Sequence, residues 1–176
     1  MHELLRTFDR VTAQYIALLP SWLHPIMTTA TLVGEPVVII SLALLTGIIA
    51  WTRGQYRIAY AEVAALTGFG INTALKFIFH RTRPHTIFVE NMRIKSYSFP
   101  SGHAYGGLVI YGLLAYLAHK YLPHPWNSIV AAGLTILTFI IGISRVYLGA
   151  HFPSDVLAGW LFGAVTLLLI ILWIKP

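Results

Sequence analysis

The stretch SFPSGHAYGGLVIYGLLAYLAHKYL, residues 98–122, joins a polar cluster to a long apolar segment. Residues 100–103, Pro-Ser-Gly-His, combine turn-forming residues with a hydroxyl group and a titratable ring. The apolar segment that follows, residues 104–122, is close to the ~20 residues that a helix needs to cross a bilayer. We therefore predict a membrane-spanning helix that begins directly after this polar cluster.

The composition of the whole chain is typical of an integral membrane protein. Of the 176 residues, 57% are hydrophobic and 10% are charged, whereas soluble domains contain about 25% charged residues. The twelve bases and six acids give a net charge of +6, which in a membrane protein indicates anionic lipid or a phosphorylated substrate rather than nucleic acid. The chain has no cysteine, which excludes disulfides, thiolate nucleophiles and cysteine-bound zinc.

Five segments are apolar enough to be spanning helices. They are residues 26–51, 58–79, 104–122, 129–143 with an extension back to 126, and 156–174. Residues 3–19 are predicted to form an amphipathic helix in the membrane interface, because Pro20 cuts short an apolar run that is flanked by charges. The alternative is a sixth span over residues 11–32. The expected fold is a single all-α membrane domain, residues 1–176.

Counting the spans places two polar loops on one face of the membrane. The loop over residues 80–103 precedes the third span, and the loop over residues 144–155 follows the fourth, so the chain has returned to the same side. The loops and the end of the second span supply Lys76, Arg83, Ser101, His103, Arg145, His151 and Asp155. Three bases, two histidines and one acid predict a pocket for an anion.

Lys76 and Arg83 are seven residues apart, close to two helical turns, so both side chains face the same way if the helix persists. Pro84 is expected to end that helix. A lysine within a span is costly, and we interpret Lys76 as functional rather than as a side chain that reaches the headgroups. The arginine fork suits phosphate, and lysine adds a point charge. Arg81, beside the interface, is interpreted as a headgroup-reaching side chain.

The cluster at residues 100–103 is expected to begin a helix. The first N–H groups of a helix have no internal partner and, with the helix dipole, form an anion site. Gly102 lets the backbone approach the anion, the Ser101 hydroxyl can donate a further bond, and His103 is placed to give or take a proton. The alternative is an ordinary serine cap beside an incidental histidine.

In the second loop, His151 and Asp155 are four residues apart around a helix that is expected to start at Pro153. A carboxylate bonded to one imidazole nitrogen fixes the tautomer and leaves the other nitrogen free to attack. The alternative is a capping aspartate beside an interfacial histidine.

Together, three stretches resemble the signature motifs of the type-2 phosphatidic acid phosphatase family. They are Lys76-x6-Arg83-Pro84, Pro100-Ser101-Gly102-His103 and Ser144-Arg145-x5-His151-x3-Asp155. That family includes membrane phosphatases of phosphatidylglycerophosphate, undecaprenyl pyrophosphate and lipid A, and the soluble vanadium haloperoxidases. The resemblance covers residues 76–155. Typical members have six spans, whereas this sequence predicts five and an interfacial helix.

The resemblance implies a role for each motif residue. His151 would attack phosphorus and carry a phosphohistidine, Asp155 would orient and polarise it, and His103 would protonate the leaving oxygen. The phosphate oxygens would be held by Lys76, Arg83, Ser101, Gly102 and Arg145. Similar enzymes need no metal or other cofactor, and the single acid near the site agrees with this expectation, because divalent metals take several oxygen ligands.

The expected function is hydrolysis of a lipid phosphomonoester or lipid pyrophosphate at the membrane surface. Transfer of the phosphate to a second lipid and non-catalytic binding or transport of a lipid phosphate remain alternatives; a haloperoxidase is disfavoured because those relatives are soluble and longer. We expect the bilayer and a membrane lipid phosphate as partners. The chain is expected in the cell inner (plasma) membrane with the site facing outward, although the positive-inside rule does not favour that orientation. Neither the lipid nor the oligomeric state is predicted.

Four features lie outside the motifs. Glu35 and Glu62 fall within spans and are assigned structural roles, and Asn72 is expected to bond between helices. Residues 86–95 mix apolar and basic side chains. This segment is predicted either to dip into the interface and meet a headgroup or to pack on the protein as an ordinary loop.

Overall fold

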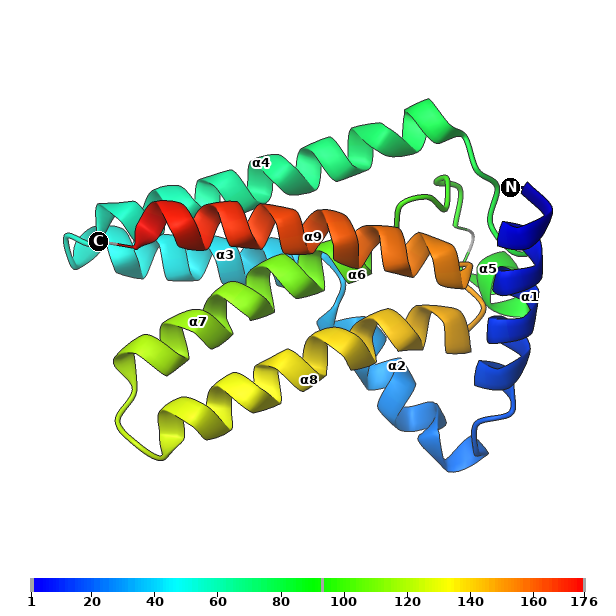
Figure 1. Ribbon diagram of the computed structural model, residues 1–176, viewed down its shortest axis with the longest axis horizontal. Coiled ribbons are helices and arrows are strands. Elements are labelled where there is room, and N and C mark those ends of the chain that lie inside the picture. The colour runs from blue at the N-terminus through cyan, green and yellow to red at the C-terminus, as the bar shows by residue number, and fades with distance from the viewer. Residues whose placement is uncertain (1, 93, 176) are drawn as a thin grey trace.

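The structure is a computed structural model that describes residues 2–92 and 94–175. The described residues form helices and turns and contain no strand, so the predicted all-α class is confirmed. The helices of the bundle run side by side along the longest axis of the molecule (Figure 1). They are α3 (Pro36–Thr52), α4 (Tyr56–Phe79), α7 (Gly112–Tyr121), α8 (Trp126–Tyr147) and α9 (Pro153–Ile174).

Among the described residues, α4, α8 and α9 are long and apolar enough to cross a membrane. A fourth span results if the bent N-terminal pair of helices is counted as one. Helix α3 is apolar but has 17 residues. The structure therefore gives three to four candidate spans by length and composition, where the sequence predicted five.

The first predicted span is broken in the middle. Helix α2 (His24–Val33) ends at Gly34, Glu35 adopts an extended conformation, and Pro36 begins α3. Proline disfavours the helical conformation in the residue before it, and Glu35 is extended directly before Pro36, which accounts for the break. The prediction of one continuous helix over residues 26–51 is wrong, and the break places a carboxylate at the end of the bundle that holds the site.

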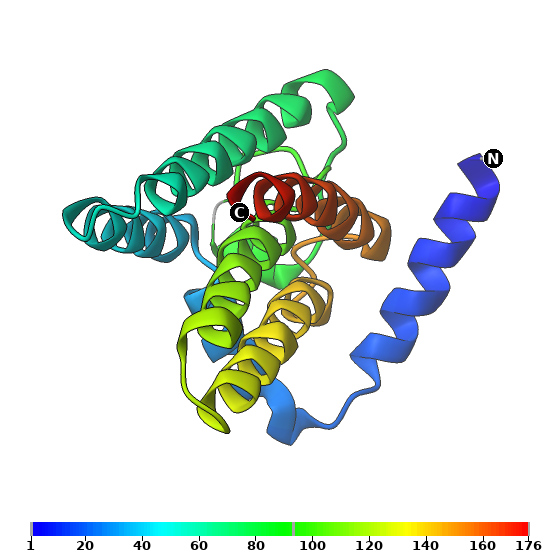
Figure 2. The same ribbon diagram turned by 60° about the vertical axis from the view of Figure 1, so that its left-hand side comes forward.

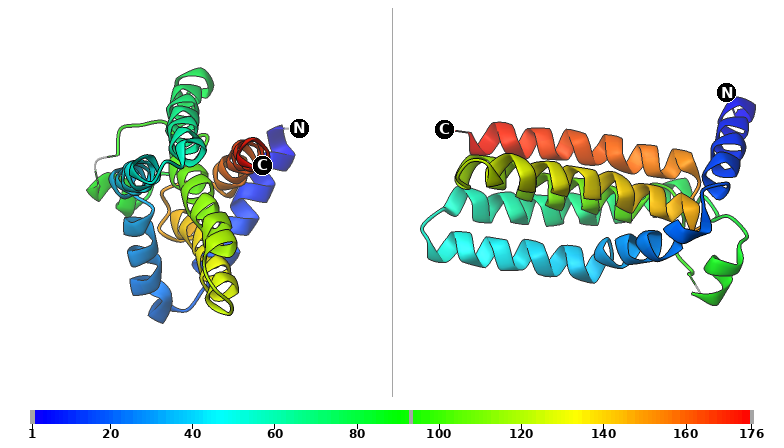
Figure 3. Two further views of the ribbon diagram at one scale, coloured as in Figure 1. Left: turned by 90° about the vertical axis from the view of Figure 1, so that its left-hand side faces the viewer. Right: turned by 90° about the horizontal axis from the view of Figure 1, so that it is seen from below.

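The N-terminal helix α1 (His2–Ala17) lies across the end of the bundle (Figure 3). The chain bends by 92° between residues 3–17 and 21–33, so residues 11–32 do not form one straight span. After the short helix η1 (Ser21–Leu23), α2 returns along α8. Helix α1 packs on α8 and α9, on the side of the bundle away from α3 and α4 (Figure 2).

Helix α1 turns an apolar stripe away from the protein. Leu4 and Tyr15 are 77% and 71% exposed, whereas Asp9 is only 3% exposed. The exposed stripe, at helical spacing, consists of Leu4, Phe8, Val11 and Tyr15. Helices on the surface of soluble proteins bury their apolar face and expose their charges. In α1 the buried side chain is a carboxylate, and its partners belong to the site.

The segment quoted first forms the centre of the bundle. Helices α6 (Gly102–Gly106), η2 (Gly107–Tyr111) and α7 follow one another without a break, and η2 is a π-helical turn. Such turns are frequent at functional sites. The N-terminal end of α6 packs closely on α9. A Cβ atom at Gly159 of α9 would lie only 2.6 Å from the Ser101 carbonyl oxygen. Gly159 therefore lets the start of α6 approach the second turn of α9.

The C-terminal ends of α8 and α4 decide where three of the predicted site residues lie. Helix α8 continues to Tyr147, so Ser144 and Arg145 lie in its last turn rather than in a loop. Helix α4 ends at Phe79, before Pro84, and His80 adopts the left-handed conformation with φ of 48°. The helix therefore ends where the second span was predicted to end and does not persist to Arg83, so the condition under which Lys76 and Arg83 would face the same way is not met.

Candidate active site

The ends of four helices and the loops between them enclose a cavity of about 460 Å³. Six of the eight residues predicted for the site line it: Lys76, Arg83, Gly102, His103, Arg145 and His151. Ser101 and Asp155 lie behind the wall and are fully buried. The two polar loops are joined directly, because the Thr86 hydroxyl donates to the Gly149 carbonyl oxygen at 3.0 Å.

His151 is held between a cation and a carboxylate. Arg83 Nη1 lies 2.9 Å from Nε2, and Asp155 Oδ2 lies 3.4 Å from Nδ1. Because arginine only donates, Nε2 must present its lone pair and the ring proton must be on Nδ1, facing Asp155. Burial, and then the charge of Arg83, lower the pKa of His151 well below its ordinary value of 6.5. The ring is therefore a neutral base whose Nε2 lone pair is at the cavity and accepts from Arg83.

Asp155 is the third residue of α9, which begins at Pro153 as predicted. Oδ2 accepts from the backbone N–H of Phe152 at 2.9 Å and faces His151. Oδ1 accepts from Arg81 Nη1 at 2.7 Å. Both carboxylate oxygens are thus occupied, which fixes the plane of the group relative to the imidazole.

Arg81 is not a headgroup-reaching side chain, and that interpretation was wrong. Besides Asp155, it donates to Ser154 Oγ at 2.7 Å and pairs with Asp9 Oδ2 at 2.6 Å. Its guanidinium lies 4.3 Å from the centre of the Phe152 ring. The left-handed turn at His80 directs Arg81 back toward α9, and the sequence pattern did not predict this turn.

Lys76 and Arg83 reach the same cavity from a helix and from the extended segment after it. Lys76 Nζ donates to the carbonyl oxygens of Pro100 at 2.7 Å and Tyr97 at 3.0 Å. Arg83 Nη1 also donates to the carbonyl oxygen of Ala150 at 2.8 Å. The two cations therefore hold the backbones of both loops as well as contributing charge to the cavity.

His103 is paired with a residue that sequence reasoning placed in a structural role. Glu35 lines the cavity, and its Oε1 lies 3.4 Å from His103 Nε2. The signal that could have found it is a carboxylate within a predicted span, which is costly unless it is functional. Glu62, by contrast, accepts from Thr46 at 2.6 Å between α4 and α3, which agrees with a structural role.

Arg145 is positioned by a residue that the sequence analysis missed. Its Nη1 donates to the hydroxyl of Thr31 in α2, and the guanidinium lies 5.8 Å from the Phe88 ring centre. Phe88 belongs to α5 (Ile87–Asn91), a short helix within the loop over residues 80–103. The predicted contact of this loop with lipid headgroups stays a prediction.

Ser101 and Gly102 begin α6 in different ways. Ser101 Oγ accepts from the Ala104 N–H at 3.4 Å, and its own N–H donates to the Asp155 carbonyl oxygen at 3.0 Å. It is thus a helix cap, and its hydroxyl does not reach the cavity. At Gly102 an added Cβ would have no neighbour nearer than 3.9 Å, so this side of the helix start is open. The expected interhelical bond of Asn72 is not formed within the described residues.

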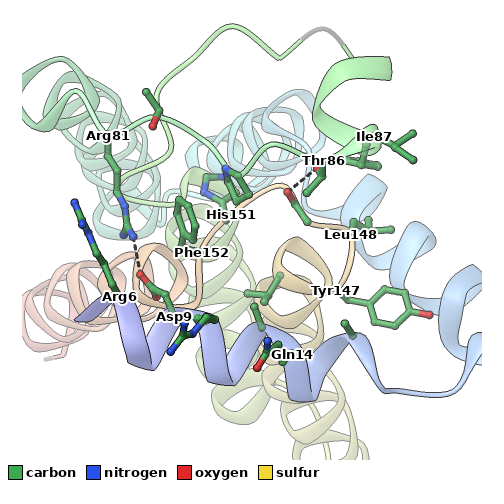
Figure 4. A pocket seen from close by; sticks show the side chains of 18 residues that line it. Arg6, Asp9, Gln14, Arg81, Thr86, Ile87, Tyr147, Leu148, His151 and Phe152 are labelled. Carbon is green, nitrogen blue, oxygen red and sulfur yellow. Dashed lines mark hydrogen bonds and ion pairs between the residues drawn. The ribbon is translucent and has the colours of Figure 1, made fainter. Parts of the chain in front are cut away.

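A second cavity, of about 1000 Å³, lies between α1 and the loops. Figure 4 shows Arg81 directed at Asp9, with His151 and Phe152 at the back of the space. Arg6 and Arg10 of α1 also line it. His151 therefore contacts both cavities, while Lys76, His103 and Arg145 face only the smaller one.

Comparisons with known proteins found a family and several relatives of similar sequence. The family model described as PAP2 superfamily matches residues 56–176. Phosphatidylglycerophosphatase B of Bacillus subtilis is 33% identical over 159 residues, which cover 85% of this chain and 74% of that protein. Undecaprenyl-diphosphatase BcrC of the same organism is 28% identical over 109 residues, covering 60% and 52% of the two chains.

Two solved structures share the fold. The crystal structure of a transmembrane PAP2-type phosphatidylglycerolphosphate phosphatase from Bacillus subtilis superposes with a TM-score of 0.81 at 28% identity, covering 94% of this chain and 84% of that one. The crystal structure of Aquifex aeolicus LpxE gives 0.64 at 23% identity, with 96% and 93% covered.

Proposed function

Since the chain belongs to the PAP2 superfamily and is a lipid phosphatase, we propose that it hydrolyses a lipid phosphomonoester or lipid pyrophosphate through a phosphohistidine on His151. One observation carries the proposal: Nε2 of the buried His151 is 2.9 Å from Arg83, and Nδ1 faces Asp155. This is the geometry of a nucleophile whose tautomer is fixed from behind by a carboxylate.

In the proposed mechanism, positive charge holds the phosphate at the cavity. Arg83 and Arg145 supply planar forks, Lys76 supplies a point charge, and the start of α6 at Gly102 supplies backbone N–H groups. Phosphoryl transfer depends mainly on positioning and charge stabilisation, so these groups can act without a metal ion. Ser101 contributes by capping α6 and thereby fixing where that helix starts.

The reaction then proceeds in two displacements. His151 Nε2 bonds to phosphorus while the bond from phosphorus to the lipid oxygen breaks, and His103 gives that oxygen a proton. Water next attacks phosphorus, the P–N bond breaks, and His103 takes the proton of the water. Arg83 now donates to the lone pair of Nε2, so its bond must pass to a phosphate oxygen as attack begins.

The proposed placement in the bilayer has five spans and an interfacial α1. Helices α4, α8 and α9 are three of these spans, the continuous run α6–η2–α7 is the fourth, and the pair α2–α3 is the fifth. The run over residues 102–121 is about 30 Å long at 1.5 Å per residue. The exposed apolar stripe of α1 supports a helix that lies in the interface. We place the chain in the inner membrane with the site on the outer face.

The test is phosphate release by the full-length protein in detergent micelles. The substrates are phosphatidylglycerophosphate, phosphatidic acid and undecaprenyl pyrophosphate, each with and without excess EDTA. We expect release from at least one lipid, unchanged by EDTA and lost in His151→Ala. The matched control is His119→Ala, at the exposed end of α7, which should keep full activity. Activity that EDTA abolishes and magnesium restores would overturn the metal-free mechanism.

A further inference from the structure

We propose that α1 positions the catalytic pair: Asp9 holds Arg81 in the orientation that keeps Asp155 facing His151. One continuous chain of contacts leads from Asp9 through Arg81 and Asp155 to His151. Asp9 lies 142 positions before His151 in the sequence (151 − 9). Asp9 and Arg81 are positioning residues, since they act through Asp155. The proposal rests on the proposed function, in which His151 is the nucleophile.

Both carboxylate oxygens of Asp9 accept hydrogen bonds from residues around the site. Its Oδ1 accepts from the Ser154 N–H at 2.8 Å, and its Oδ2 accepts from Ser154 Oγ at 2.8 Å and from Arg81 at 2.6 Å. These bonds use the free N–H at the start of α9, where a carboxylate is favoured by the helix dipole. Asp9 therefore fixes the first turn of the helix that carries Asp155.

Arg81 connects the two carboxylates. One nitrogen, Nη2, pairs with Asp9, and the other, Nη1, pairs with Asp155 Oδ1. The Phe152 ring packs against the guanidinium and limits its rotation. Because Asp9 occupies Nη2, Arg81 meets Asp155 through a single nitrogen and a single oxygen. Asp155 Oδ2 is left to face Nδ1 of His151.

Loss of the Asp9 charge changes this arrangement in a defined way. Arg81 would be free to form the two-pronged pair that arginine and carboxylate prefer, taking both oxygens of Asp155. The carboxylate would then turn away from Nδ1, and one guanidinium would neutralise one carboxylate. Asp155 would stabilise the positive charge on the His151 ring less well during attack on phosphorus. Substrate contacts in the cavity would stay in place.

The experiment compares Asp9→Asn with Glu3→Gln, which removes the same charge from an exposed position of the same helix. Both variants of the full-length protein are assayed on the lipid that the wild type cleaves. For metal-ligating histidines, the partners behind the ring contribute about 10- to 100-fold, and we expect a loss of that order in kcat for Asp9→Asn. KM should stay within about twofold of wild type, and Asp9→Glu should recover part of the loss. Glu3→Gln should match wild type.

A double-variant cycle separates positioning from docking. If Asp9 acts through Arg81, the kcat of Asp9→Asn combined with Arg81→Gln should equal that of Arg81→Gln alone. Losses that multiply would overturn the proposal, and so would a kcat for Asp9→Asn within twofold of wild type. If Asp9→Asn raised KM and left kcat at the wild-type value, that result would also contradict the proposal. Retained activity in His151→Ala would instead overturn the proposed function, so the two failures are distinguishable.

Discussion

The residues before α4 and the residues from α4 onward contribute to the site in different ways. The family model begins at residue 56, and all eight residues predicted for the site lie beyond that point. The N-terminal third supplies three polar side chains, Asp9, Thr31 and Glu35, none of which belongs to a motif. Each contacts a side chain of the other region. Asp9 pairs with Arg81, Thr31 accepts from Arg145, and Glu35 faces His103.

The two regions supply two kinds of side chain: the region from α4 onward supplies the proposed reacting groups, and the region before α4 supplies side chains that hold them in position. In the proposed mechanism, the groups that attack, protonate or bind phosphate come from residues 76–155, and three of their partners come from the residues before α4. The division predicts that substitutions in the motifs remove chemistry, whereas substitutions before α4 weaken it. The following changes test this division, from the largest expected effect to the smallest.

His103→Ala should produce the largest effect that depends on the substrate. General acids contribute about 10²–10⁴-fold and matter most when the leaving oxygen is basic. The variant should lose most of its activity on an alkyl lipid phosphate and retain much more on p-nitrophenyl phosphate, if the cavity accepts that ester. The measurement is the ratio of variant to wild-type rate for each substrate. Equal ratios would contradict the role of His103 as the proton donor.

Arg83→Lys and Arg145→Lys should each lower kcat/KM by about 1.5–3 kcal/mol, or roughly 10- to 150-fold, because a charge-assisted fork is lost while the charge remains. Arg81→Lys should also be harmful, since its two nitrogens bond to two different carboxylates. The matched control is Arg57→Lys, at the opposite end of α4. A neutral Arg83→Lys beside a severe Arg57→Lys would show that the phosphate site is misplaced.

Glu35→Gln should affect the same step as His103 but less strongly. Its carboxylate lies 3.4 Å from His103 Nε2, so its removal leaves the acid in place but without its charged partner. We expect a loss smaller than the ~10²-fold that marks loss of a general acid. The loss should be confined to substrates with a basic leaving group. A uniform loss on both ester types would indicate that Glu35 serves substrate binding instead.

Thr31→Val should have a modest effect, because it removes the hydroxyl that accepts from Arg145 Nη1 and, at 3.2 Å, from Ser144 Oγ. Such bonds contribute about 1 kcal/mol, or roughly fivefold in kcat/KM. The control is Thr28→Val on the same helix, whose hydroxyl donates to the His24 carbonyl oxygen within α2. Should both variants reduce kcat/KM equally, Thr31 would act through helix stability rather than through Arg145.

The pH profile should show no acid limb near 6.5. Burial and the neighbouring charges of Arg83, Arg145, Lys76 and His103 lower the pKa of His151, and the carboxylate of Asp155 faces it. A lowered pKa means that the neutral, attacking form persists as the pH falls through 6.5. The kcat/KM of wild type should therefore show no fall from protonation of His151 between pH 7.5 and about 6. A fall centred on 6.5 would show an ordinary, solvated imidazole.

The site was more predictable from the sequence than its supports were. Residue spacing and the counting of spans placed Lys76, His103 and His151 at one end of the bundle, because motif order and membrane crossings are local properties. The pairing of Asp9 with Arg81 depends on a left-handed His80 and on how α1 packs across the bundle. Neither has a local sequence signal, since contacts between residues 72 positions apart (81 − 9) follow from tertiary packing.

The broken first span is an intermediate case. Glu35-Pro36 was visible within the apolar run, and proline restricts the residue before it. That rule was sufficient to predict the break, but the apolar length of residues 26–51 favoured one helix. The consequence for the site was large, because the break is what brings Glu35 to the cavity beside His103.

The most direct test of the central claim is to trap the phosphoenzyme. The full-length protein is mixed with a lipid substrate labelled with ³²P in its terminal phosphate, quenched within one turnover, and analysed for protein-bound label. A bond from phosphorus to histidine nitrogen is labile in acid and stable in base. We predict label with this stability in wild type, with none in His151→Ala. Label that persists in His151→Ala, or that is stable in acid, would contradict His151 as the nucleophile.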